Sequence, residues 1–200
     1  MTTRTTPPAA PAPAHTAPPA APAAPARARP TLRSAPGSDP ARTAPVAPDA
    51  YRDAISLLPT GVSVVTAVRS GAPAGCTANA VMSLSLDPPS LLVSLITGSR
   101  TLAAVTEAGT FAVNVLAWPD RHLAQRFATA APHERFEGVT WSLAHGAPVL
   151  TRSTLTAVCE VSEAVPLLDH TIVAGTVTWL RTENTEPTVL YRHRQHVLRP

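Results

Sequence analysis

The distribution of proline constrains this chain more than any other feature. Thirteen of its 23 prolines fall within the first 48 of 200 residues, and alanine fills most of the positions between them. Such a segment has no apolar periodicity and buries too little surface to offset the entropy lost on ordering. We therefore expect residues 1–48 to form a disordered tail and residues 49–200 to form one domain with its own core.

Charge separates the same two parts. The tail has five arginines against one aspartate, a net charge of +4, whereas the whole chain carries +3. The domain is therefore close to neutral, at −1, and its charge does not indicate a nucleic-acid-binding face. Aromatic residues make up only 4% of the chain, which leaves few rings to stack on bases. No run approaches the roughly 20 apolar residues of a membrane span, so we expect neither nucleic acid nor a membrane as a partner.

The cysteines and histidines show no metal-binding pattern. Cys76 and Cys159 lie far apart without a CxxC motif, so we expect reduced thiols in a cytoplasmic protein. His193 and His196 are three positions apart on an expected strand and point to opposite faces of it, which argues against a shared metal ion. The sequence also contains no G-x-S-x-G or H-E-x-x-H motif, so it offers no evident nucleophile or metalloprotease site.

Turn and breaker residues divide the domain into short segments. Helices are expected at residues 49–58 with Asp49 as cap, at 99–108 between the cap Ser99 and the stop Gly109, and at 119–130. Strands are expected at residues 61–68, 75–86, 91–96, 110–117, 169–181 and 188–198, and residues 148–164 are expected to form one long strand or a bent pair.

Several details of these strands are also predicted. The first two should form a hairpin, residues 91–96 should be buried on both faces, and residues 188–198 should close the sheet. Trp141 and Cys159 are expected in the core. Many strands, few helices and short turns indicate a mainly β fold, an antiparallel barrel with attached helices. A Rossmann domain is excluded, because helices and strands do not alternate and no G-x-G-x-x-G occurs.

One stretch has the composition of a ligand site. Residues 75–90 read GCTANAVMSLSLDPPS, in which small and hydroxyl residues alternate with apolar ones before the prolines end the segment. Small side chains let a flat ligand approach the backbone, whose N–H groups and neighbouring hydroxyls can then bond its edge. The alternative is an ordinary edge strand that ends at a proline turn.

A second stretch is suited to an anion. Residues 97–101, TGSRT, open a helix with free N–H groups, hydroxyls and an arginine, which together attract a phosphate group. Ordinary capping beside a solvated arginine is the alternative.

Seven pieces in order carry a resemblance to a known family. They are residues 59–66 (PTGVSVVT), 75–89, 99–101 (SRT), 109–116 (GTFAVNVL), 135–139 (RFEGV), 169–170 (DH) and 190–191 (LY). With this spacing the chain, over about residues 50–198, resembles the flavin reductases, small NAD(P)H:flavin oxidoreductases that serve two-component monooxygenases. The resemblance implies an FMN-binding split β-barrel with Greek-key-like topology, and a homodimer with flavin sites near the subunit interface. It also implies FMN (or FAD) and NADH or NADPH as cofactors, and a partner monooxygenase that receives reduced flavin.

The resemblance also implies which residues bind the cofactors. Thr60, Gly61 and Val62 would lie against the flavin ring. The ring and ribityl chain would be lined by Thr77, Ala78, Asn79 and Ala80, within the small-residue stretch that also contains Ser83. Ser99, Arg100 and Thr101 would hold the phosphate, and His170 would contact the nicotinamide nucleotide. Arg194 is a candidate for cofactor phosphate, with a solvated terminal strand as the alternative.

Two positions depart from the family pattern. Ala80 stands where serine is common and lacks that hydroxyl, and Leu168 stands where glycine usually precedes Asp169 and His170. A structural histidine bonded by Asp169 is therefore an alternative for His170. At the level of function, the alternatives are an oxidoreductase of this fold that keeps its flavin and acts on its own substrate, and a flavin-binding module without catalysis.

Overall fold

The computed structural model describes residues 44–198, so the predicted tail lies, apart from its last five residues, outside the described residues. The helices are α1 (Pro48–Ile55), α2 (Arg100–Ala108) and α3 (His122–Thr129), with a short 3₁₀ turn η1 (Trp118–Asp120). The strands are β1 (Thr60–Gly61), β2 (Ser63–Arg69), β3 (Ala72–Ala78), β4 (Val81–Leu86), β5 (Pro89–Ile96), β6 (Thr110–Leu116), β7 (Trp141–Ala144), β8 (Ala147–Leu150), β9 (Ser153–Leu167), β10 (His170–Thr182), β11 (Thr188–Tyr191) and β12 (Arg194–Val197).

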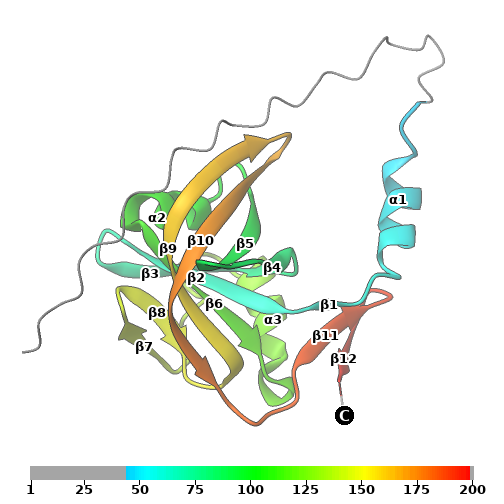
Figure 1. Cartoon of the computed structure of the whole chain (residues 1–200). Coiled ribbons are helices and arrows are strands. Elements are labelled where there is room, and N and C mark those ends of the chain that lie inside the picture. Colours follow the sequence, from blue (N-terminus) through cyan, green and yellow to red (C-terminus); the bar gives the residue numbers. More distant parts are fainter. Residues whose placement is uncertain (1–43, 199–200) are drawn as a thin grey trace, which may run out of the picture. The chain divides into compact units, whose positions relative to one another are not determined.

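A seven-stranded antiparallel sheet forms the body of the fold, in the order β3-β2-β6-β9-β10-β5-β4 (Figure 1). Its two edge strands, β3 and β4, are consecutive in the chain, and only Asn79 and Ala80 separate them. A flat sheet would hold these edges about 29 Å apart, at roughly 4.8 Å per strand step, whereas two linking residues reach about 11 Å. The sheet must therefore curl until its edges meet. The expected mainly β, split-barrel fold is confirmed.

The barrel interior packs against α2. Phe111, Val93 and Val173 from the sheet are fully buried and share a cluster with Leu102 and Val105 of the helix. The predicted helix limits are confirmed, because the Ser99 hydroxyl accepts a hydrogen bond from the Leu102 N–H at 3.2 Å, and Gly109 ends the helix at a φ of 66°. Cys159 is completely buried in this cluster, as predicted.

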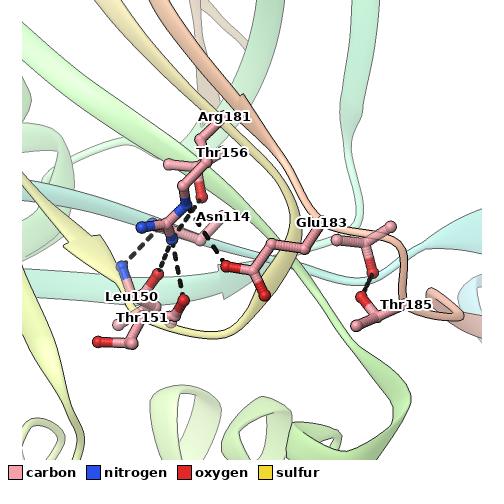
Figure 2. Close-up of polar contacts among 8 residues, drawn as sticks. Asn114, Leu150, Thr151, Thr156, Arg181, Glu183 and Thr185 are labelled. Atoms are coloured by element: carbon pink, nitrogen blue, oxygen red, sulfur yellow. Dashed lines mark hydrogen bonds and ion pairs between the residues drawn. The ribbon is translucent and has the colours of Figure 1, made fainter.

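A buried polar network fixes the β7–β8 hairpin on the barrel (Figure 2). The Asn114 amide donates to the Val64 carbonyl at 3.1 Å and accepts from the Leu150 N–H at 2.9 Å. The Arg181 guanidinium donates to the Leu150 and Thr151 carbonyls and lies 3.6 Å from Glu183. These bonds satisfy polar groups that burial would otherwise leave unpaired.

Two predictions about strands were wrong. Residues 75–86 are not one strand, because β3 pairs with β2 whereas β4 pairs with β5 at the other edge of the sheet. Residues 188–198 do not close the large sheet, because β11 and β12 form a three-stranded sheet with β1. In both cases the hydrophobic pattern indicated strands correctly but contained no information about their partners.

Two burial predictions and one capping prediction were also wrong. On β5 only Val93 and Leu95 are buried, because its other face is partly open, and Trp141 is 36% exposed because β7 lies outside the large sheet. Helix α1 starts at Pro48 and has no side-chain cap, so Asp49 lies in its first turn. No α1 residue is buried, and its apolar side chains face outward.

Candidate functional site

A cavity of about 400 Å³ opens where α2, α3 and the ends of β3 and β5 meet. This volume lies within the range typical of small-molecule sites. Its lining consists of Cys76, Thr77, Ala78, Asn79, Ala80, Ser94, Leu95, Ile96, Ser99, Arg100, Thr101, Phe127, Ala128, Pro132, Arg135 and His170. Of the thirteen predicted site residues, eight are brought together here: four from the β3 end, three from the α2 start, and His170.

The α2 start forms one rim of the cavity. Ser99 has an extended backbone and caps the helix, while Thr101 is buried and Arg100 is exposed. Arg100 makes no ion pair or side-chain hydrogen bond among the described residues. The first-turn N–H groups and this free cation give the rim a positive potential.

The β3 end forms the back wall. The Thr77 hydroxyl donates to the Ala124 carbonyl of α3 at 2.6 Å, which joins strand and helix. Asn79 and Ala80 then leave the strand and are exposed. Because the side chains here are small, a flat ligand can lie close to the backbone.

The loop after α3 also lines the cavity and is bonded to β3. Arg135 donates from Nη1 to the Gly75 carbonyl at 2.7 Å and from Nε to the Ala130 carbonyl at 3.1 Å. A Cβ built on Gly75 would lie 3.3 Å from Phe127 and 2.9 Å from the Val65 carbonyl oxygen, so this glycine lets the strand and helix pack closely. The guanidinium thereby ties the loop to the strand that forms the back wall.

His170 lies at the start of β10, where it pairs with Ile96 of β5 close to the start of α2. Its Nδ1 atom lies 2.8 Å from the Asp169 carboxylate, and this contact lowers the Asp169 pKa. The side chain is 41% exposed, and Nε2 is left for a ligand.

The electrostatics of the cavity favour an anion. Among the described lining residues the titratable groups are Cys76, His170 and two arginines, and there is no carboxylate. Burial raises the pKa of the Cys76 thiol, although a hydrogen bond with Thr101 and the charge of Arg135 oppose this effect, so the thiol is neutral at physiological pH.

A second hollow, of about 230 Å³, lies beside Asp120, but Arg152 already bonds that carboxylate at 2.8 Å. The free charges therefore single out the first cavity.

Comparison with known proteins agrees with this geometry. The family described as "Flavin reductase like domain" matches residues 55–198. The chain belongs to the flavin reductase family. It is accordingly an oxidoreductase.

Individual members of the flavin reductase family give the extent of the likeness. The "Probable flavin reductase" of Rhizobium meliloti is 41% identical over 133 residues, which are 66% of this chain and 42% of that protein, so the chain spans less than half of that relative. The NADH:FAD oxidoreductase of Streptomyces globisporus, solved with NAD and FAD fragments, is 31% identical with a TM-score of 0.70 over 75% of this chain and 92% of that one. The styrene monooxygenase flavin reductase of Pseudomonas putida is 29% identical with a TM-score of 0.67 over 75% and 97%.

Five predicted site residues of this member of the flavin reductase family lie elsewhere. Thr60 lines an adjoining hollow of about 210 Å³ that shares Asn79 with the cavity, and open space surrounds the Cα of Gly61. Val62 is 3% exposed and packs in the core beside Phe127. Ser83 on β4 and Arg194 on β12 are exposed and do not line the cavity. Their cofactor roles stay predictions.

Sequence reasoning missed several lining residues, of which Arg135 is the most informative. It lies in the family-like piece RFEGV, but no local pattern shows that this loop returns to β3, 60 positions earlier.

Leu168, which stands where the family usually has glycine, adopts a left-handed backbone with a φ of 56°, a conformation that glycine adopts without strain. Among residues 44–198, no group of three potential metal ligands occurs, and no helix has the length and apolar character to cross a membrane.

Proposed function

We propose that this chain is an NAD(P)H-dependent flavin reductase that reduces FMN (or FAD) and releases it to a separate monooxygenase. The observation that carries the proposal is the cavity, in which a helix start with an unpaired arginine, a small-residue wall and a histidine converge without a carboxylate. The named relatives supply the activity class, and one of them is the reductase of a styrene monooxygenase.

The residues present fit a flavin. The small side chains of Thr77, Ala78 and Ala80 would let a ring system approach the strand, and the α2 start, which lines the same cavity, is suited to a phosphate group. Exposed N–H groups at the β3–β4 break can bond the polar edge of the ring. The missing Ala80 hydroxyl removes one such contact.

The chain's own residues bind, orient and exclude water. When both cofactors are bound, the nicotinamide supplies hydride and the flavin accepts it, so the protein needs no nucleophile or base. Ser99, Arg100 and Thr101 would fix the phosphate and thus the position of the ring. Phe127 and Pro132 provide an apolar wall, and His170, oriented by Asp169, would position the nicotinamide nucleotide.

We also propose a homodimer with the site beside its interface. The apolar side chains Tyr51, Ile55, Leu57 and Leu58 near α1 are 44–58% exposed, and those of β4, Met82, Leu84 and Leu86, are 50–89% exposed. Asn79 borders the cavity, the hollow against α1 and the apolar hollow against β4, so these surfaces adjoin the site. A second copy would cover them and remove apolar area from water.

The two free thiols support a cytoplasmic location.

The proposed homodimer predicts that a single substitution can prevent dimerisation without unfolding the subunit. Leu57→Glu places a charge just after α1, where the side chain is 52% exposed. We expect a folded monomer in sedimentation equilibrium where the unaltered chain is a dimer. An unaltered chain that is monomeric at all concentrations would disprove the homodimer.

The activity is tested by following nicotinamide oxidation at 340 nm, with NADH and NADPH each combined with FMN, FAD and riboflavin. We expect turnover that requires added flavin and saturates with it. A chain that oxidises neither nucleotide above background is not a flavin reductase. Stoichiometric yellow flavin that never exchanges would instead indicate an enzyme that acts on its own substrate, and flavin binding without turnover would indicate a binding module.

A further inference from the structure

Arg135 is a half-buried cation without a counter-ion. Its two printed bonds both go to neutral backbone carbonyls, those of Gly75 and Ala130, and no described carboxylate forms an ion pair with it. A guanidinium has five N–H groups, so three remain without a partner among the described residues. A cation withdrawn from water without a counter-ion is costly, and a bound anion would remove that cost.

Arg135 lies close to the phosphate rim of the cavity. Its Nη1 donates to the carbonyl of Gly75, and the next residue of β3, Cys76, lines the same cavity as Thr101 of α2. Both arginines line the same cavity, Arg100 from the start of α2 and Arg135 from the loop after α3. Two guanidinium groups that have no counter-ion among the described residues therefore line the same cavity from different elements.

We propose that Arg135, together with Arg100, binds the flavin phosphate and makes the site select a phosphorylated flavin over riboflavin. The inference rests on the proposed function, since it assigns a ligand group within the same cavity. Arginine is suited to this role because its fixed fork donates two parallel, charge-assisted hydrogen bonds to phosphate oxygens. The carbonyl bonds to Gly75 and Ala130 would hold that fork in place before the ligand arrives.

A purely structural role is the competing explanation, because Arg135 also ties the loop to β3. The chain offers a matched control for it. Arg126 on α3 donates to the Glu137 carbonyl of the same loop but does not line the cavity. Arg126→Gln therefore loosens the loop without removing a charge from the site, whereas Arg135→Gln does both.

The test is the ratio of the riboflavin and FMN dissociation constants, measured by flavin fluorescence on the full chain. We expect Arg135→Gln to lower this ratio roughly tenfold or more, the loss of one charge-assisted bond, with riboflavin affinity unchanged. Arg126→Gln should leave the ratio as it is, and Arg135→Lys, which keeps the charge but loses the fork, should give a ratio between those of the unaltered chain and Arg135→Gln. Inorganic phosphate should compete with FMN in the unaltered chain and less in Arg135→Gln.

Equal weakening of FMN and riboflavin by Arg135→Gln would overturn the inference and leave Arg135 a loop contact. An unchanged ratio with a higher KM for NADH would also overturn it, because the anion bound would then belong to the nicotinamide nucleotide. Binding of neither flavin to the unaltered chain would refute the proposed function itself, which separates the two failures. A crystal structure with FMN tests the contact without any variant: Arg135 about 3 Å from a phosphate oxygen supports it, and a guanidinium turned away from the phosphate refutes it.

Discussion

The α2 rim of the cavity rests on the core, whereas the β9–β10 rim, residues 168–170, projects beyond it. On the α2 side Thr101, Leu102 and Val105 are buried and the helix is capped at both ends. On the other side Leu168 is 95% exposed and has a left-handed backbone. The two rims face the same cavity with very different amounts of support.

The tip of the projecting rim buries little surface, because residues 162–169 are all exposed. The Thr97 N–H donates to the Asp169 carbonyl at 3.0 Å, and the Thr97 and Thr171 hydroxyls lie 3.0 Å apart. Segments with few buried contacts open locally at low free-energy cost. Under the proposed function, the firm rim suits the flavin phosphate, which fixes the position of the ring. The softer rim suits the nicotinamide nucleotide, which must enter and leave in each turnover.

Removing the support of the α2 rim should have the largest effect. Leu102→Ala deletes a side chain that is 9% exposed in the main core, and we expect a loss of about 3 kcal/mol in the free energy of unfolding. Urea denaturation measures it, with Ile55→Ala in the exposed helix α1 as control, where we expect a change within about 0.5 kcal/mol. Similar losses for both variants would mean that α1 is as well supported as α2.

The next effect concerns binding at the same rim. Arg100→Ala removes an exposed cation that supports no other described residue, so folding should be unchanged. We expect FMN affinity to fall by about 1.5–3 kcal/mol, the value of a hydrogen bond to a charged group, as measured by fluorescence titration. Arg121→Ala is the control, since Arg121 stacks on Trp118 at 4.3 Å and does not line the cavity. An unchanged dissociation constant for FMN would remove Arg100 from the site.

The two rims also differ in how well the sequence predicted them. The α2 rim was predicted in detail because its information is local: Ser99, an apolar face and Gly109 lie within eleven residues and fix the helix directly. Around Leu168 the sequence showed only that leucine replaces the glycine usual in the family. It did not predict the backbone conformation, because a positive φ at this position depends on how β9 and β10 pair.

Long-range pairing explains most of the errors elsewhere. Asn79 and Ala80 look like the middle of one strand, yet they join strands at opposite edges of the sheet. Arg135 escaped notice because its partners, Gly75 and Ala130, lie 60 and 5 positions away in different elements. Only the closure of the barrel brings these groups to one cavity.

A smaller effect is expected at the tip of the projecting rim. Leu168 adopts a φ of 56°, a conformation that costs a residue with a Cβ roughly 1–2 kcal/mol. Leu168→Gly relieves this strain but increases the entropy of the unfolded chain, by about 0.4–1 kcal/mol. We therefore expect a net stabilisation of about 0.5–1 kcal/mol, visible as a rise in Tm. A lower Tm would show that the leucine side chain makes contacts that outweigh the strain.

The smallest effect should appear at Asp169, next to this tip. Its hydrogen bond with His170, and secondarily the charge of that histidine, lower its pKa below the ordinary value of 3.8. A carboxyl group with a lowered pKa in the folded state binds protons more readily when unfolded, so its stabilising contribution is present above about pH 4 and is lost as the pH falls further. The Tm difference between the unaltered chain and Asp169→Asn should therefore be small at neutral pH and disappear as the pH falls through the lowered folded-state pKa of Asp169. Because the carboxylate is exposed to water, a difference that instead grew toward low pH would mean that another group carries the titration.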